Sequence, residues 1–149
     1  MTKRIHPIAG AAALLTILCF WLSTLLTELF AGAPTVATVK TLIPWGFLIL
    51  IPALMAAGGS GLRLARTMRG PLVAAKKKRM PVIAANGLLI LVPSALYLSA
   101  KAQAGAFDAA FYAVQGLELV AGAVNILLLG LNMRDGLRLT GRRRPAAQP

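Results

Sequence analysis

Four long apolar stretches, separated by short polar segments, dominate the pattern along the chain. They cover residues 7–30, 41–62, 81–100 and 107–133. A helix rises about 1.5 Å per residue, so about 20 residues cross the roughly 30 Å of hydrocarbon in a bilayer. Backbone groups in lipid must be hydrogen-bonded within their own segment, so we predict that each stretch is a helix. The pattern therefore predicts an all-α membrane protein, with residues 1–149 forming one four-helix transmembrane bundle.

The composition agrees with this class. Of the 149 residues, 58% are hydrophobic and 13% are charged, against about 45–50% and about 25% in soluble domains. The four spans take up more than half of the chain, which leaves no room for a separate soluble domain. The single cysteine, Cys19, lies within the first stretch, which excludes an intrachain disulfide and a cysteine zinc site.

The sixteen Lys and Arg residues are distributed unevenly between the segments. Two precede the first stretch, seven lie in 63–80 and five in 134–149, whereas only Lys40 and Lys101 lie on the other side. Short segments rich in Lys and Arg stay in the cytoplasm. We therefore predict a multi-pass protein of the inner (plasma) membrane, with both termini and a basic loop over 63–80 in the cytoplasm.

The net charge of +12 would favour a nucleic-acid partner if the protein were soluble. Here the basic residues form clusters between apolar stretches, so we predict no binding of nucleic acid. The run Lys76, Lys77, Lys78 and Arg79 is instead expected to contact anionic lipid headgroups of the bilayer.

An alternative interpretation of the first stretch is a cleaved signal peptide. Lys3 and Arg4 precede it, and Ala31-Gly32-Ala33 follows it in the manner of a cleavage site. The apolar run of about 20 residues exceeds the usual 7–15, so a retained helix is favoured. Cleavage would leave three spans in the same orientation.

Polar residues in the fourth stretch recur at alternating steps of three and four. This spacing places them on one face of a helix. The face comprises Asp108, Phe111, Gln115, Glu118, Gly122, Asn125, Leu129 and Asn132. Because lipid does not tolerate such side chains, we expect this face to point into the bundle or toward a partner. Gly122 would let a neighbouring backbone approach closely.

Glu118 is the most informative residue of this face. It is expected near the middle of the membrane, where the sequence offers no Lys or Arg at the same depth, so its carboxyl should take up a proton. One interpretation is a proton-relay, ion or ligand site. The other is a hydrogen bond to Asn125 or Thr16 that fixes the register of the helices. Gln115 and Asn86 complete the predicted intramembrane polar site.

His6 is the only histidine and lies at the start of the first stretch. As a ligand of haem b it would need a methionine or the His6 of a second copy to complete the iron. The alternative is contact with lipid phosphate. The glycine-rich segment 58–61 lacks the Gly-Lys-Ser/Thr of a phosphate loop, so we expect it to end a helix or to allow tight packing.

The sequence contains no Ser-His-Asp set, HExxH motif or nucleotide-binding loop, so it does not favour an enzyme. The leading hypothesis is a non-enzymatic accessory or anchor subunit of a membrane complex, or a small homo-oligomer. The alternatives are a redox carrier that binds haem b or quinone, and a small proton-coupled transporter or channel centred on Glu118.

Overall fold

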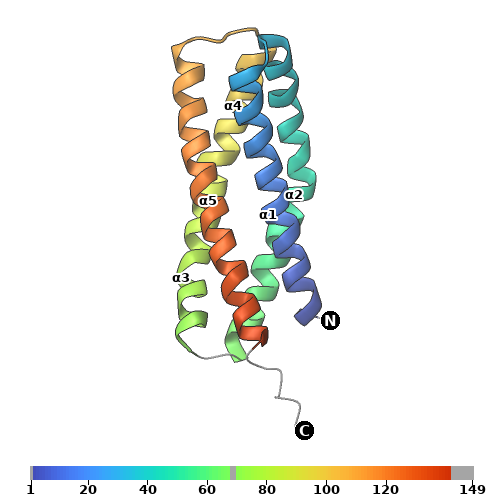
Figure 1. Cartoon of the computed structure of the whole chain (residues 1–149), viewed down its shortest axis with the longest axis vertical. Coiled ribbons are helices and arrows are strands. Elements are labelled where there is room, and N and C mark those ends of the chain that lie inside the picture. The colour runs from blue at the N-terminus through green and yellow to red at the C-terminus, as the bar shows by residue number, and fades with distance from the viewer. Residues whose placement is uncertain (1, 68–69, 142–149) are drawn as a thin grey trace.

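The computed structural model describes residues 2–67 and 70–141. Nearly all of these residues are helical. The helices are α1 (Thr2–Phe30), α2 (Ala33–Thr67), α3 (Pro71–Asn86), the π-helical turn η1 (Gly87–Leu91), α4 (Val92–Gln103) and α5 (Ala109–Gly141). Because α3, η1 and α4 follow one another without a break, they form one long helix. The chain therefore folds as an up-and-down bundle of four (Figure 1).

The start of α1 and the end of α5 lie at one end of this bundle (Figure 1). We call this the terminal end, and we call the opposite end, which carries residues 31–32 and 104–108, the turn end. Four helical segments are long and apolar enough to cross a membrane: His6–Phe30, Ala33–Leu64, Pro71–Gln103 and Ala109–Leu139. The prediction of four such helices is confirmed.

The helices extend well beyond the apolar stretches that predicted them. The prediction of a basic loop over 63–80 is wrong for most of its length, because α2 continues to Thr67 and α3 begins at Pro71. Lys and Arg are good helix formers, so a helix can continue past the point where its apolar stretch ends. Gly70, with a φ of 129°, and Pro71 in the first turn of α3 mark the break instead. Residues 142–149 of the predicted basic tail lie outside the described residues.

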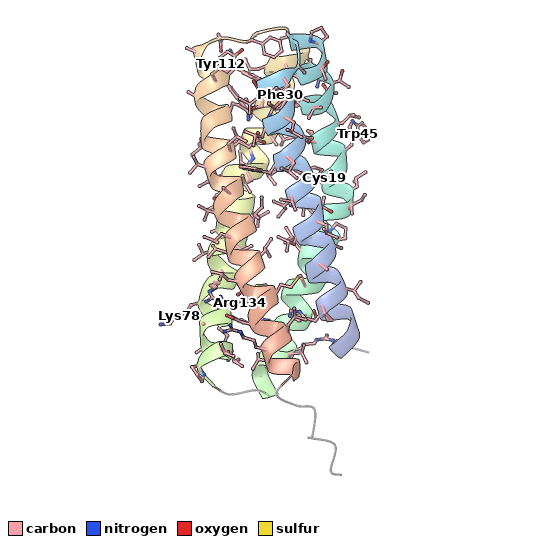
Figure 2. The ribbon with its side chains drawn as sticks, in the orientation of Figure 1. Cys19, Phe30, Trp45, Lys78, Tyr112 and Arg134 are labelled. Carbon is pink, nitrogen blue, oxygen red and sulfur yellow. The ribbon has the colours of Figure 1, made fainter. Side chains whose placement is uncertain are left out.

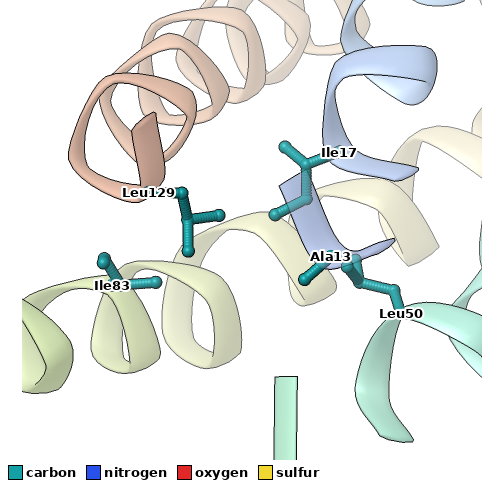
Figure 3. Close-up of a cluster of buried hydrophobic side chains, with 5 residues drawn as sticks. All are labelled: Ala13, Ile17, Leu50, Ile83 and Leu129. Atoms are coloured by element: carbon teal, nitrogen blue, oxygen red, sulfur yellow. The ribbon is translucent and has the colours of Figure 1, made fainter. Parts of the chain in front are cut away.

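One hydrophobic cluster joins four helices in the half of the bundle nearer the terminal end. It contains Ala13 and Ile17 from α1, Leu50 from α2, Ile83 from α3 and Leu129 from α5 (Figure 3). We call it the lower apolar layer. A second cluster near the turn end contains Val36, Leu98, Ala102 and Phe111, and we call it the upper apolar layer.

Two glycines allow aromatic rings of α1 to pack against neighbouring helices. A Cβ on Gly46 would lie 2.2 Å from Cζ of Phe20, and a Cβ on Gly122 would lie 2.8 Å from Cδ1 of Trp21. The Trp21 indole also donates a hydrogen bond of 2.8 Å to the carbonyl of Leu119. Gly122 thus accommodates a side chain, where the sequence predicted the approach of another backbone. These contacts fix α1 against α2 and α5.

Two prolines within the spans are accommodated differently. The helix α2 continues through Pro52, whereas Pro93 is the second residue after η1. Proline lacks an N–H and its ring clashes with the carbonyl four residues earlier, which here belongs to Leu89 within η1. The wider π turn accommodates this clash by shifting the local hydrogen-bond pattern.

The outer surface of the bundle is largely apolar. On α2, an exposed stripe contains Trp45, Leu48, Ile49 and Met55, which recur at helical spacing. Figure 2 shows Trp45 on the outside of α2, with Phe30 and Tyr112 toward the turn end and Lys78 and Arg134 toward the terminal end.

Candidate functional site

The face of α5 that the sequence singled out points into the bundle. Phe111, Gln115, Asn125, Leu129 and Asn132 are all buried. Asp135, three residues after Asn132, lies on the same side of the helix and is only 1% exposed. Asp135 lies beyond the predicted apolar stretch, and strict alternation of three and four residues would have led from Asn132 to Gly136 instead, so the pattern did not single it out.

Glu118 forms an ion pair with Lys40 of α2. The Lys40 Nζ lies 2.6 Å from Glu118 Oε2, and the two side chains are 1% and 13% exposed. The expectation that Glu118 has no basic partner at its depth is therefore wrong. Since α2 begins at Ala33, Lys40 lies about two turns inside the helix, and its flexible stem carries the ammonium to the bundle interior.

A threonine of α1 completes this contact, but not the threonine that the sequence suggested. Lys40 Nζ lies 3.4 Å from Oγ1 of Thr24, which is buried. Thr16, the predicted partner of Glu118, instead donates its hydroxyl to the carbonyl of Ala12 in its own helix, at 2.8 Å. Thr24 lies eight residues further along α1, about two turns nearer the turn end.

Asn125 pairs with Asn86 rather than with Glu118. The Asn86 amide donates to Oδ1 of Asn125 at 2.9 Å and to the carbonyl of Ala121 at 2.8 Å. Two of the predicted site residues therefore meet each other, and they link α3 to α5. The pair lies nearer the terminal end than Glu118, between the ion pair and the lower apolar layer.

A second carboxylate, Glu28 of α1, approaches the ion pair from the turn end. It lies close enough to Lys40 and Glu118 to interact electrostatically with both. Two carboxylates thus face one ammonium, a formal charge of −1 when all three groups are ionised. We call these groups and Thr24, together with Gln115 one turn before Glu118 on α5, the charge cluster.

Three polar atoms of the charge cluster are buried without a hydrogen-bond partner within the described part of the chain: Glu28 Oε1, and Oε1 and Nε2 of Gln115. Gln115 is 4% exposed. Buried polar groups in native proteins are nearly always hydrogen-bonded. These three atoms are therefore the feature of the interior that most needs an explanation.

Apolar layers lie on both sides of the charge cluster. Along α5, Phe111 of the upper apolar layer precedes Gln115 and Glu118, and Leu129 of the lower apolar layer follows them. The cluster is therefore enclosed near the turn end. Glu28 and Glu118 are its partly exposed members, and of the two Glu28 lies nearer the turn end.

A separate polar group lies at the terminal end. The Arg79 guanidinium lies 2.7 Å from Oδ2 of Asp135, and the Arg134 guanidinium lies 3.3 Å from Oδ1. Lys76 also interacts electrostatically with Asp135. Of the four basic residues expected to contact lipid, Lys76 and Arg79 are thus engaged with a buried carboxylate. Lys77 and Lys78 are exposed, and Figure 2 shows Lys78 on the outside of α3.

His6 packs against α2. Its Nδ1 lies 3.1 Å from both the carbonyl of Ala57 and the hydroxyl of Ser60, and a Cβ on Gly61 would lie 2.9 Å from its Cε1. The glycine-rich segment therefore serves tight packing rather than ending the helix. Among residues 2–67 and 70–141, no group of three or more His, Cys, Asp or Glu side chains is placed to hold a metal ion.

Asp108 directly precedes α5 at the turn end. Its Oδ1 accepts a hydrogen bond of 2.9 Å from the N–H of Phe111, and its other oxygen pairs with Lys101. The hydrogen bond from Lys101, followed by that from the Phe111 backbone, lowers the pKa of Asp108 below its ordinary value. This exposed pair is distinct from the charge cluster.

The charge cluster is therefore an enclosed set of charges in which some polar atoms lack a hydrogen-bond partner among the described residues. The other internal polar pairs, Asn86 with Asn125 and Arg79 with Asp135, contact each other directly. Comparison of the chain with protein-family models, with curated proteins and with solved structures found no match.

Proposed function

We propose that this chain is a small proton-coupled membrane transporter or channel, in which Glu28, Lys40 and Glu118 form the proton-binding site. The observation that carries the proposal is the unequal number of opposite charges enclosed among the helices. Ionisable residues inside membrane helices are costly, and they mark ion and proton pathways.

The proposed orientation follows from the distribution of charge. Fourteen of the sixteen Lys and Arg residues lie toward the terminal end or in the segments attached to it, which favours a cytoplasmic position for that end in the inner membrane. The turn end then faces outward. Glu28, near the outer end of α1, becomes the entry group, and Glu118 lies behind it.

The chemistry of the cluster supports proton binding. With one ammonium facing two carboxylates, a single proton on either carboxylate makes the set neutral, and removal of the net charge lowers the cost of burial. Toward the terminal end, the inward face of α5 carries only uncharged residues from Leu119 to Asn132. Release of the proton toward the terminal end therefore requires the lower apolar layer to move or to admit water.

Proton flux into proteoliposomes tests this proposal. The purified protein is reconstituted around a pH-sensitive dye, and a potassium diffusion potential drives protons inward. We expect measurable flux for wild type, at least a tenfold loss for Glu118→Gln, and unchanged flux for Asp108→Asn. Asp108 is the matched control because it is an exposed carboxylate at the same end of the bundle. Equal silence of wild type and Glu118→Gln across pH would overturn the proposal.

The apolar exterior favours a second candidate, a non-enzymatic accessory or anchor subunit or a homo-oligomer. The α2 stripe of Trp45, Leu48, Ile49 and Met55 offers a continuous apolar contact surface to lipid or to another helix. In this case the charge cluster is structural, so Glu118→Gln should keep the assembly intact and Glu118→Leu should loosen it. Native mass spectrometry of wild type, Glu118→Gln and Glu118→Leu tests this candidate. Equal stability of the three assemblies would exclude a structural role for Glu118.

A further inference from the structure

The charge cluster contains two polar layers of similar composition, one turn apart. We call these two polar layers the lower and the upper layer, and they differ from the apolar layers described above. In the lower layer, Thr24 of α1 and Glu118 of α5 surround the ammonium of Lys40. Four residues further along α1 is Glu28, and three residues earlier on α5 is Gln115. Steps of three and four keep side chains on the same helical face. Because α1 and α5 run in opposite directions (Figure 1), both steps lead toward the turn end.

Each layer therefore offers one carboxylate and one neutral oxygen, one from α1 and one from α5. The lower layer combines a hydroxyl on α1 with a carboxylate on α5, and the upper layer combines a carboxylate on α1 with an amide on α5. The lower layer is occupied by an ammonium group of the chain itself. In the upper layer, Glu28 Oε1 and the Gln115 amide have no hydrogen-bond partner among the described residues.

We infer that Glu28 and Gln115 bind a small monovalent cation that donates hydrogen bonds, of the ammonium or primary alkylammonium class. The inference deepens the proposed function and rests on it, since it names a cation that binds next to the proton-binding site. The excess carboxylate supplies the opposite charge, and the two oxygens of the upper layer accept N–H donors. Glu28, which is partly exposed, provides access from the turn end.

The hydrogen-bonding requirement separates this class from alkali ions. Potassium and ammonium are similar in size, but a metal cation is held by a shell of several oxygens, about six in the case of Ca²⁺ and Mg²⁺, and the upper layer contributes two unpaired side-chain oxygens. An ammonium ion instead needs directional acceptors, as Lys40 shows within the same cluster. Tetramethylammonium carries the same charge without any N–H donor, so it serves as the matched probe.

The test measures thermal unfolding of the full chain in nanodiscs, followed by tryptophan fluorescence, at constant ionic strength. The probes are ammonium, methylammonium, potassium and tetramethylammonium chlorides. We expect saturable stabilisation by the first two and none by the last two. Gln115→Met should abolish the response. The variant should fold normally, because methionine of similar shape replaces an amide that lacks partners among the described residues.

Three outcomes would overturn the inference: an equal response to potassium, no response to ammonium, or an undiminished response in Gln115→Met. The proton-flux assay is run in ammonium-free buffer and compares wild type with Glu118→Gln. A negative result with ammonium beside positive proton flux therefore rejects the cation class and leaves the proposed function standing. Loss of both signals in wild type rejects both.

Discussion

Replacing Lys40 with methionine should destabilise the bundle more than any other single change in the charge cluster. Methionine keeps most of the lysine stem but removes the ammonium that lies 2.6 Å from Glu118. The variant leaves Glu118 facing the second carboxylate, Glu28, without a cation between them. Glu118→Leu is the milder change, because Lys40 then keeps the electrostatic interaction with Glu28.

The size of the effect follows from the geometry. Two unit charges 2.6 Å apart attract each other by about 6 kcal/mol at an effective dielectric constant of about 20. Desolvation offsets part of this attraction, and breaking one side of a buried pair costs about 3–5 kcal/mol. We therefore expect Lys40→Met to lower the free energy of unfolding by about 3–5 kcal/mol and Glu118→Leu by less. The double variant should lose less than either single variant, since no unpaired charge of this pair remains.

Unfolding in mixed micelles with increasing dodecyl sulfate measures these values. The fluorescence of Trp21 reports the α1–α5 contact directly, because its indole bonds to the Leu119 carbonyl. A Trp45→Phe background removes the signal of the second, exposed tryptophan. The cycle of two single variants and the double variant then isolates the coupling free energy of the pair.

Ordinary hydrogen bonds between membrane helices contribute about 0.6 kcal/mol on average and reach about 1.7. A coupling above about 2 kcal/mol therefore identifies a true ion pair between Lys40 and Glu118. If Lys40→Met costs less than about 1 kcal/mol, or if the single effects simply add in the double variant, the reasoning from the buried pair is refuted.

Three further predictions concern other parts of the bundle. Gly46→Ala should destabilise the protein by about 1–3 kcal/mol through overpacking against Phe20, and Phe20→Leu should restore part of the loss in the same unfolding assay. Arg79→Met should cost up to about 3 kcal/mol, because Asp135 is 1% exposed although a second arginine stays within reach; an effect below about 0.5 kcal/mol would contradict this. Asp108→Asn should lower the melting temperature at neutral pH. Because the pKa of Asp108 is lowered in the folded state, its stabilisation is present above the ordinary carboxyl range and is lost as the pH falls; a difference that grows on acidification would contradict the assignment.

The four-helix architecture could be predicted because hydrocarbon thickness and backbone hydrogen bonding leave few alternatives to long apolar helices. The ends of the helices could not be predicted in the same way. Apolarity marks the part of a helix that avoids water, while the basic residues from Lys76 to Arg79 continue α3 in helical form. Only a backbone signal, the pair Gly70 and Pro71, marked the true break.

The inward face of α5 could be predicted because alternating steps of three and four define one side of a helix whatever its neighbours are. The partner of Glu118 could not, since it depends on which helix lies opposite and at what height. The short turn at residues 31–32 determines the height of Lys40. It makes α1 and α2 an antiparallel pair in which Thr24 and Lys40 lie at similar distances from the turn. Counting residues outward from that turn would have placed Lys40 inside the bundle.

The π-helical turn η1 has a consequence for insertions and deletions in the third helix of the bundle. Asn86 bonds to α5 and Leu98 packs in the upper apolar layer, so both point inward. Across twelve residues of regular α-helix, the side chains of Asn86 and Leu98 would point in directions about 120° apart. The extra residue of a π turn reduces this angle to about 20°. Deleting one residue within 87–91 would convert η1 to regular helix and preserve the alignment. The same deletion a turn away on either side would rotate one half of the helix by about 100°, so this segment is where the helix can change length without losing its contacts.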